Sequence, residues 1–566
     1  MTSELAEIFE KDFSKKLEKS FKTDSSSQQL ALVQLIRTFD TIHFGKEFLN
    51  ISVNNGLDPL YEHGLHKSII PFLGSARKTD RYALAKTNDE MSNWAHSVVQ
   101  QGGRVTLFQL YTDYCKYDLM EFSQLEERKI SYRHKDSIVP VEFIEKIEWE
   151  LYLRSLKVPY AQDIQNFVKQ FGSYIKSEMR DRVDVYLDHY IQYKTTPEID
   201  AFFHILASYR CKSLLHAELF NHDLKFGGVK FEKYVEAVTW IISFSLKHAW
   251  FCQELLLKRP HLQLMNIVTY MTETNQIIRD LSLCMEIDYK EAEIIFNTMC
   301  LDSSNIKSFQ ASTLPPFVRL SRGIVIRTMK GALANPFSFI MKEVRRKFQY
   351  EWDRSVDERE VRFRNEFLEL LASIPGIVGA IDPLIIKEGK KVKTDIDAIF
   401  FNIKTGSLAL IQLKWQDPFG GLSERYSRKS NFILNGNKWV QSVSDWIAEV
   451  GPPGVLKATR LDQVKGLKLN TIHLFVVGRY FSDFSGIDER DSRSAWTNWA
   501  RLTKVVQTNL SNENFLKDPI LWMREKFSTQ NRVIIKEAYG SSIMKIHDYE
   551  IDFPDLDLKK IMEKLT

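Results

Sequence analysis

The stretch TDIDAIFFNIKTGSLALIQLKW, Thr394 to Trp415, reads as two apolar strands joined by a turn that contains glycine. Side chains alternate between the two faces of a strand. One face of the predicted hairpin is wholly apolar, and its members are Ile396, Ala398, Phe400, Ala409, Ile411 and Leu413. The other face, which also carries Ile399, Phe401, Leu408 and Leu410, has polar residues at one end: Asp395, Asp397, Gln412 and Lys414. Apolar residues on both faces predict central strands of a buried sheet.

The register of the hairpin decides which polar residues meet. A two-residue turn centred on Thr405 and Gly406 places Asp397 opposite Lys414, and a centre one residue earlier places it opposite Gln412. Both registers bring the polar side chains together at one end of one face. Unpaired polar groups in such a place cost about 1–3 kcal/mol each, so these groups are expected to satisfy one another or a ligand. A divalent cation held by the acid would do so, and the lysine could then touch a phosphate.

The elements around this hairpin follow a regular order. A helix is predicted from the amphipathic segment VDEREVRFRNEFLELLASI, strands from GIVGAIDPLIIKEG, KTDIDAIFFN and SLALIQLKW, a second helix from NGNKWVQSVSDWIAEVG, and a further strand from LNTIHLFVVGRYF. The order helix, three strands, helix, strand predicts a mixed α/β sheet with helices on its faces.

This arrangement resembles a known family over residues 350 to 480 or so. Asp397 followed by Gln412-Leu413-Lys414 is similar to the metal-dependent PD-(D/E)XK nuclease superfamily, in the branch with glutamine in place of the carboxylate before x-Lys, as in Mrr-type restriction enzymes. The core of that family has the same element order and carries a glutamate on its first helix. Glu366 fits this position, because it lies on the apolar stripe of its helix with Phe363 and Leu370.

The resemblance implies a Mg²⁺- or Mn²⁺-dependent endonuclease that hydrolyses phosphodiester bonds of DNA. Asp397 would hold the metal, with Glu366, Gln412 and the carbonyl of Leu413 as further ligands. Lys414 would stabilise charge on the phosphate or position the attacking water.

Two residues of the second helix are candidates for phosphate contacts. Lys438 and Gln441 lie one turn apart in NKWVQSVSDW. The alternative is an exposed helix face with Trp439, Val443 and Trp446 turned inward.

The neutral Gln412 leaves a second function open. Fewer anionic ligands would remain for a cation, so an inactive nuclease fold that serves as a nucleic-acid-binding or assembly module is the alternative to a catalyst. A nuclease joined to a large helical module suggests a prokaryotic restriction or anti-phage defence role, by analogy only.

The chain before the α/β segment has helical periodicity from about residue 30 to 300. The pattern is interrupted at LDSSNIKSFQASTLPPF. The predicted domains are a helical region, residues 1–315, that recognises a target, binds a partner, forms an oligomer or restrains cutting, and a nuclease-like α/β domain with a C-terminal extension, residues 316–566.

Composition also bears on whether the chain is secreted, spans a membrane or binds nucleic acid. The five cysteines have no CxxC spacing, and the charged N-terminal segment has no apolar core of a secretory signal, so a reduced cytoplasmic chain is expected. The most membrane-like run, AVTWIISFSL, is too short to span a membrane and predicts a buried helix. A net charge of +4 does not by itself imply nucleic acid, although basic residues cluster in KEVRRKF, KEGKKVK and RYSRK.

Overall fold

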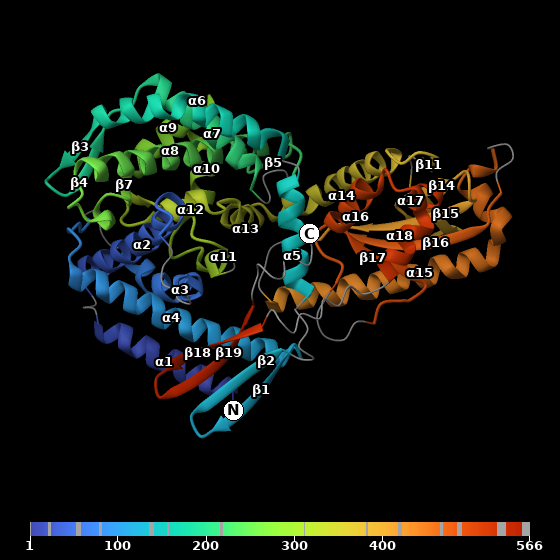
Figure 1. Cartoon of the computed structure of the whole chain (residues 1–566), viewed down its shortest axis with the longest axis horizontal. Coiled ribbons are helices and arrows are strands. Elements are labelled where there is room, and N and C mark those ends of the chain that lie inside the picture. The colour runs from blue at the N-terminus through green and yellow to red at the C-terminus, as the bar shows by residue number, and fades with distance from the viewer. Residues whose placement is uncertain are drawn as a thin grey trace.

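A computed structural model places a large, mostly helical part beside a smaller α/β part (Figure 1). The residues that the structure describes are 2–20, 24–51, 58–77, 82–134, 141–155, 158–214, 219–310, 312–380, 383–416, 422–463, 468–483, 489–528 and 539–556. The chain is therefore a multidomain protein that combines helices with several mixed sheets, as the sequence predicted.

The helical part is organised around one long buried helix, α8. Its apolar run is buried on several sides, with Ala237, Val238 and Ile242 fully inaccessible, which confirms the predicted core helix. The helices of this part are α1 (Thr2–Ser20), α2 (Ser25–Phe48), α3 (Asp58–Ile69), α4 (Asp89–Lys116), α5 (Val141–Ser155), α6 (Val158–Arg182), α7 (Pro197–Lys212), α8 (Phe231–Lys258), α9 (Thr274–Met285), α10 (Tyr289–Met299), α11 (Ile306–Gln310), α12 (Met329–Leu333) and α13 (Phe337–Lys347). Short 3₁₀ helices are η1 (Ile70–Arg77), η3 (Leu264–Asn266) and η4 (Leu461–Gln463).

A small sheet ties the helical part together across the predicted domain boundary. Its strands lie in the order β7 (Tyr270–Glu273), β10 (Ile324–Arg327), β9 (Phe317–Arg319) and β8 (Cys300–Leu301). The expected division between residues 315 and 316 therefore falls inside this sheet. The core of the helical part continues through α12 and α13 to Trp352, whereas a separate core begins at Phe363. Helix α14 (Gln349–Ala372) contributes residues to both cores.

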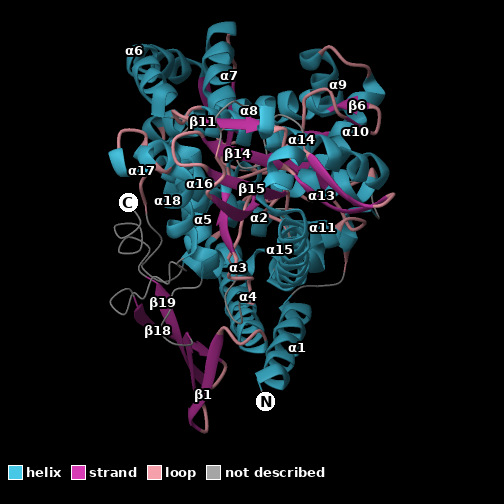
Figure 2. Cartoon of the chain, turned by 90° about the vertical axis from the view of Figure 1, so that its right-hand side faces the viewer, coloured by secondary structure: helices cyan, strands magenta, loops and turns pink. Residues whose placement is uncertain are grey.

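The C-terminal extension returns to the helical part. Its strands β18 (Tyr539–Ile546) and β19 (Tyr549–Leu556) join β1 (Met120–Glu126) and β2 (Lys129–His134) in the order β1-β2-β19-β18. Ile551 and Phe553 are buried in the core that also contains α1 and α4. In Figure 2 these strands project below the helices, next to α1. Two further hairpins are β3 (Val183–Tyr186) with β4 (Tyr190–Tyr193), and β5 (Lys225–Phe226) with β6 (Val229–Lys230).

The α/β part is built on a five-stranded sheet in the order β11-β14-β15-β16-β17. The strands are β11 (Ile377–Ala380), β14 (Ala398–Asn402), β15 (Ser407–Lys414), β16 (Thr471–Gly478) and β17 (Ser494–Asn498). The pairs β11–β14 and β14–β15 are antiparallel, and the pairs β15–β16 and β16–β17 are parallel. The helices are α14, α15 (Leu422–Ala458), α16 (Trp499–Asn509), α17 (Glu513–Lys517) and α18 (Pro519–Ser528).

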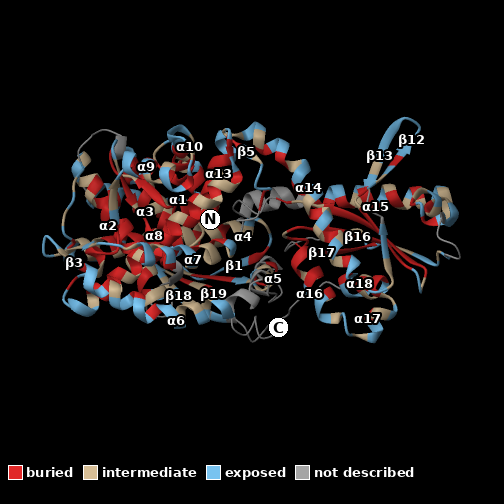
Figure 3. Ribbon diagram, turned by 90° about the horizontal axis from the view of Figure 1, so that it is seen from above, coloured by how far each residue is buried: buried red, intermediate tan, exposed pale blue. Residues whose placement is uncertain are grey.

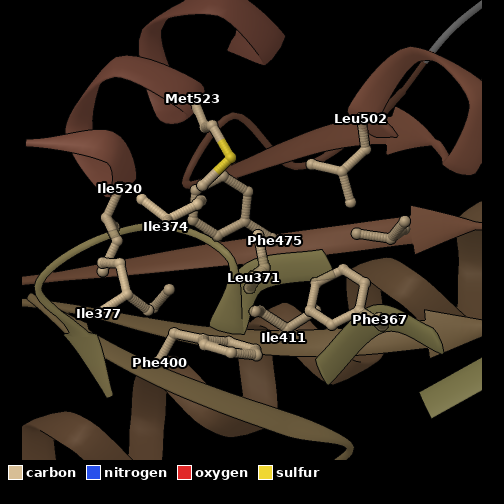
Figure 4. Close-up of a pocket in the computed structure, with 12 residues that line it drawn as sticks. Phe367, Leu371, Ile374, Ile377, Phe400, Ile411, Phe475, Leu502, Ile520 and Met523 are labelled. Atoms are coloured by element: carbon tan, nitrogen blue, oxygen red, sulfur yellow. The ribbon is translucent and has the colours of Figure 1, made fainter. Parts of the chain in front are cut away.

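Helices cover both faces of this sheet. Phe363, Phe367 and Leu371 recur every four residues along α14 and pack with α16 and α18 on one face. Figure 4 shows Phe367 and Leu371 beside the strand residues Phe400, Ile411 and Phe475. On the other face, Trp439, Val443 and Trp446 of α15 are buried against β14, β15 and β16, as the sequence predicted. The burial of both faces explains the unbroken apolar character of the central strands.

Each of the two strands predicted before β15 is divided in the structure. The segment GIVGAIDPLIIKEG forms β11 and β12 (Leu384–Glu388), and the segment KTDIDAIFFN forms β13 (Lys391–Ile396) and β14. Strands β12 and β13 pair with each other as a separate hairpin beyond the sheet. Asp397 lies at the break between β13 and β14. Ile396 packs with the α15 face rather than with Ala398, so the regular alternation predicted through Asp397 is wrong at that point.

Helix α5 belongs to the helical part by sequence but packs on the α/β part. The backbone amides of Ser482 and Asp483 donate hydrogen bonds to Glu145, at 2.6 and 3.0 Å. Arg501 of α16 pairs with Glu148 at 3.0 Å. Helix α5 therefore covers the loop that follows β16 and the first turn of α16, although many residues separate it from them in the chain.

Candidate functional site

Asp397 and Gln412 face one another across the antiparallel pair of β14 and β15. Ala398 pairs with Ile411, so the next pair outward is Asp397 with Gln412. The loop between the strands spans residues 403–406, which selects the earlier of the two turn positions considered from the sequence. The register therefore joins the acid to the amide rather than to the lysine.

The carboxylate of Asp397 is held by groups of β15. Its Oδ2 atom accepts hydrogen bonds from Nε2 of Gln412 and, at 2.7 Å, from the backbone amide of Leu413. Burial raises the pKa of Asp397 to about 6, and the nearby Asp395 carboxylate adds to this rise. The hydrogen bond from Leu413 and the charge of Lys414 oppose it. A carboxyl whose pKa is displaced in this way is typical of functional sites.

Lys414 interacts electrostatically both with Asp397 and with a second acid, Glu360. Glu360 of α14 is exposed, but the surrounding protein atoms partly desolvate its carboxylate and raise its pKa. The charge of Lys414 lowers this pKa, whereas the charges of Asp357 and Asp395 raise it. Within the described part of the chain, the Lys414 ammonium makes no hydrogen bond or ion pair. Lys414 is therefore an unpaired cation at the end of β15, within the electrostatic reach of Asp397 and Glu360.

Glu366, the helix-borne acid predicted from the sequence, has other contacts. Its Oε1 atom accepts a hydrogen bond from Arg362, one turn earlier, at 3.0 Å. Its Oε2 atom pairs with Arg479, which follows β16, at 2.5 Å. Both carboxylate oxygens are thus engaged by arginines, and the side chain is about a quarter exposed, at 27%. Glu366 is neither on the open surface nor paired with Arg362 alone.

Arg479 connects Glu366 to the end of β15. Its backbone amide donates to the carbonyl of Lys414 at 2.9 Å. Its guanidinium lies 5.1 to 5.9 Å from the ring centres of four aromatic residues, which are Trp149, Phe363, Trp415 and Trp499. The ring faces attract the guanidinium, and the carboxylate of Glu366 is its charged partner.

Sequence reasoning missed Glu360 and Arg479. Glu360 precedes Phe363 by three residues and Phe367 by seven, so the helical periodicity that selected Glu366 also places Glu360 near the core-facing stripe. Arg479 directly follows the apolar strand LFVVG, where a charged residue is unexpected. Both signals were present in the sequence.

Lys438 and Gln441 lie on the outer face of α15. Lys438 is exposed, whereas its neighbour Trp439 is buried and donates a hydrogen bond to the carbonyl of Asp395 at 2.6 Å. Gln441 is exposed, accepts a hydrogen bond from Arg493 at 2.6 Å and donates one to Asp445 at 2.7 Å. The exposed-face alternative therefore describes the position of both side chains, and phosphate contact by either remains a prediction.

Of the four predicted metal ligands, Glu366 has both carboxylate oxygens engaged by arginines. The other three are oxygen donors of the kind that Mg²⁺ prefers: the carboxylate of Asp397, the amide oxygen of Gln412 and the carbonyl of Leu413. Gln412 here turns its amide nitrogen toward Asp397. A half-turn of that amide would present its oxygen instead. Among the described residues, no group of three or more His, Cys, Asp or Glu side chains is placed to hold a metal ion. The donor set fits a hard cation in its chemistry, with Asp397 as the one carboxylate among these three predicted donors.

Comparison with models of protein families, with curated proteins and with solved structures gave no match. Among the described residues, no helix combines the length and the apolar character needed to cross a membrane.

Proposed function

We propose that the chain is a Mg²⁺-dependent nuclease that hydrolyses phosphodiester bonds of DNA. The observation that carries this proposal is the juxtaposition of Asp397, with its raised pKa, and the unpaired Lys414 at the ends of adjacent strands. A carboxylate that is easily neutralised by a cation, beside an ammonium free to meet a phosphate, is suited to phosphodiester hydrolysis.

The residues would have distinct tasks. Asp397 would hold the cation, with the amide oxygen of Gln412 and the carbonyl of Leu413 as further donors. When bound, the cation would polarise the phosphate. Lys414 would stabilise the charge that develops on the phosphate oxygens, because no residue that the structure describes pairs with its ammonium.

The helix-borne acid of the site is Glu360 in this proposal, in place of Glu366. The pKa of Glu360 responds to the charges of Lys414 and Asp395, whereas both oxygens of Glu366 are taken by arginines. Glu366 would act as a positioning residue, since its partner Arg479 also binds the backbone of Lys414.

The order of elements supports a restriction-endonuclease-like core. Helix α14, strands β11, β14 and β15, helix α15 and strand β16 follow one another as in the family that the sequence resembles. The β12–β13 hairpin is an insertion in that order. The large helical part would recognise a target, bind a partner or restrain cutting, and a prokaryotic restriction or anti-phage role is an analogy that rests on this combination.

A second candidate function is a nucleic-acid-binding or assembly module without catalysis. It is favoured by the direct hydrogen bond from Gln412 to Asp397, which satisfies the carboxylate without a cation, and by the lack of a three-residue metal group among the described side chains.

The deciding experiment is incubation of the purified full chain with supercoiled and linear DNA, with and without Mg²⁺ or Mn²⁺, beside the Lys414→Met variant. Metal-dependent cleavage by the wild type that the variant lacks would support the nuclease. A wild type that binds DNA but cuts neither DNA nor RNA with either metal would support the binding module.

A further inference from the structure

The β12–β13 hairpin is an exposed arm that stands out from the α/β part. Figure 3 shows it as a pale blue projection beyond α15. Its strands pair from Leu384 with Ile396 to Glu388 with Lys391. Gly389 at the tip has a φ of 61°, a conformation that tight hairpin turns require and that glycine adopts without strain. The arm is thus a defined element of the fold.

The base of the arm is fixed next to the candidate site. Ile386 and Ile396 are buried in the core under α15, and Trp439 donates a hydrogen bond to the carbonyl of Asp395. Strand β13 ends at Ile396, directly before Asp397. The position of the arm is therefore coupled to that of the site.

The outer part of the arm is basic. The segment KEGKKVK has four lysines and one glutamate, a net charge of +3. These lysines, which are Lys387, Lys390, Lys391 and Lys393, are exposed, and none makes an ion pair with any residue that the structure describes. A β-bulge falls at Lys393, because Ile386 pairs with Thr394 while Lys387 pairs with Val392. Bulges re-aim side chains near functional sites.

The other basic clusters differ from the arm. In KEVRRKF, Arg346 and Lys347 pair with the fully buried Glu343, so those charges stabilise the fold. The side chains of RYSRK lie outside the described residues.

We propose that the β12–β13 arm binds the phosphate backbone of duplex nucleic acid beside the cutting site, through Lys391 and Lys393. This inference rests on the proposed function, because it takes the residues around Asp397 as the cutting site. It concerns the binding of nucleic acid and not its cleavage. Lysine side chains on an exposed two-stranded ribbon bind phosphates as point charges, without reading the bases.

The reach of the arm sets the expected footprint. Strands rise by about 3.3 Å per residue, so Lys393 lies about 13 Å and Lys391 about 20 Å along the chain from Asp397. Base pairs follow one another every 3.4 Å or so along duplex DNA, so the two lysines reach phosphates roughly 4 to 6 base pairs from the site.

The test compares the full-length wild type with the double variant Lys391→Ala/Lys393→Ala in EDTA, where no cutting occurs. Fluorescence anisotropy with a labelled DNA duplex gives the dissociation constant at several salt concentrations. Loss of two phosphate contacts should lower the slope of log K against log salt by about 1.8. Between about 50 and 200 mM salt, the wild type should therefore lose about 12-fold more affinity than the variant.

Two further variants make the result specific. Lys391→Arg/Lys393→Arg should keep wild-type binding, because the charges remain. Lys15→Ala/Lys16→Ala removes two exposed lysines from α1 and should leave the slope unchanged. The proposal is overturned if the Lys391→Ala/Lys393→Ala protein keeps the wild-type affinity and slope, or if the wild type binds no duplex. A different result would contradict the nuclease proposal alone. In that case the wild type would still bind duplex DNA through the arm with the expected salt dependence, but no metal would induce cutting.

Discussion

The side-chain amide of Gln412 donates a hydrogen bond to Oδ2 of Asp397 across the β14–β15 pair. An amide carries both a donor and an acceptor, so this residue can satisfy the carboxylate directly or, after a half-turn, offer an oxygen beside it. A carboxylate at the same position would instead repel Asp397 unless a cation lay between them. The glutamine therefore lets the site stay folded with the acid charged and no cation bound.

The first prediction separates catalysis from folding. Asp397→Asn keeps an oxygen that can accept the hydrogen bonds from Gln412 and Leu413, and Lys414→Met keeps the apolar stem of the lysine. Both variants should fold and bind DNA normally, while metal-dependent cleavage falls by about 100-fold or more, because the lost charges act mainly in the transition state. Single-turnover cleavage assays with circular dichroism as the folding control measure this. Equal cleavage by folded wild type and both variants would place the chemistry elsewhere.

The second prediction distinguishes the two acids of α14. Glu360→Gln should reduce cleavage with little effect on stability, because its carboxylate has no hydrogen-bonded protein partner among the described residues. Glu366→Gln should lower the free energy of unfolding by about 1–3 kcal/mol, since Arg479 loses a charged partner in a nearly buried position. Urea denaturation and cleavage rates measure the two effects. Glu358→Gln, on the exposed side of α14, is the matched control. A Glu366→Gln protein that is fully stable but inactive would return Glu366 to the site.

The third prediction concerns pH. The pKa of Asp397 is raised from 3.8 to about 6 in the folded chain. The folded state therefore binds more protons than the unfolded state between these values, so this residue's contribution to stability is present at low pH and is lost as the pH rises through about 6. Asp397→Asn removes the effect, so its stability relative to the wild type should increase from pH 4 to pH 6 or so and then level off. Thermal unfolding of both proteins across this range is the measurement, and parallel curves would contradict the raised pKa.

The fourth prediction uses the same pair of proteins to locate the metal. A cation binds the ionised carboxylate, so Mg²⁺ should raise the melting temperature of the wild type above pH 6 or thereabouts and much less below it. Asp397→Asn should show little shift at any pH. An equal Mg²⁺-induced shift in the variant would mean that the cation binds at another site.

The fifth prediction treats α5 as a structural part of the α/β domain. Arg501 is nearly buried and pairs with Glu148 of α5 and with Asp483. Arg501→Met should lower the stability of the α/β part by about 3–5 kcal/mol, because the nearly buried Glu148 loses its cation and Asp483 is left with Arg490. Arg493→Met, which breaks an exposed pair with Asp491, should change it by less than about 1 kcal/mol. Urea unfolding followed by tryptophan fluorescence compares them, and equal stabilities would show that α5 packs only loosely.

The sequence by itself determined the order of elements from α14 to β16, apart from the division of two strands, and the place of the polar residues on β15. Alternation in β14 and β15 and the four-residue spacing in α14 depend on local periodicity, so these elements could be predicted with their buried faces. The residue opposite Asp397 could be limited to Gln412 or Lys414, because the two possible turn positions of a short hairpin give only two registers. The clustering of Gln412 and Lys414 at one strand end followed from the same alternation.

Only the tertiary structure decided the contacts between distant segments. The register was selected by the whole sheet, and the partner of Glu366 proved to be Arg479, more than a hundred residues later in the chain. Helix α5 packs beyond β16 and β17 because Glu145 and Glu148 find buried donors there, which its own periodicity cannot reveal. Where the strands divide, the backbone amide of Leu413 on the neighbouring strand donates a hydrogen bond to the Asp397 side chain. Such contacts depend on the three-dimensional packing of whole elements, whereas a sequence pattern records only the preference of each element for a buried face.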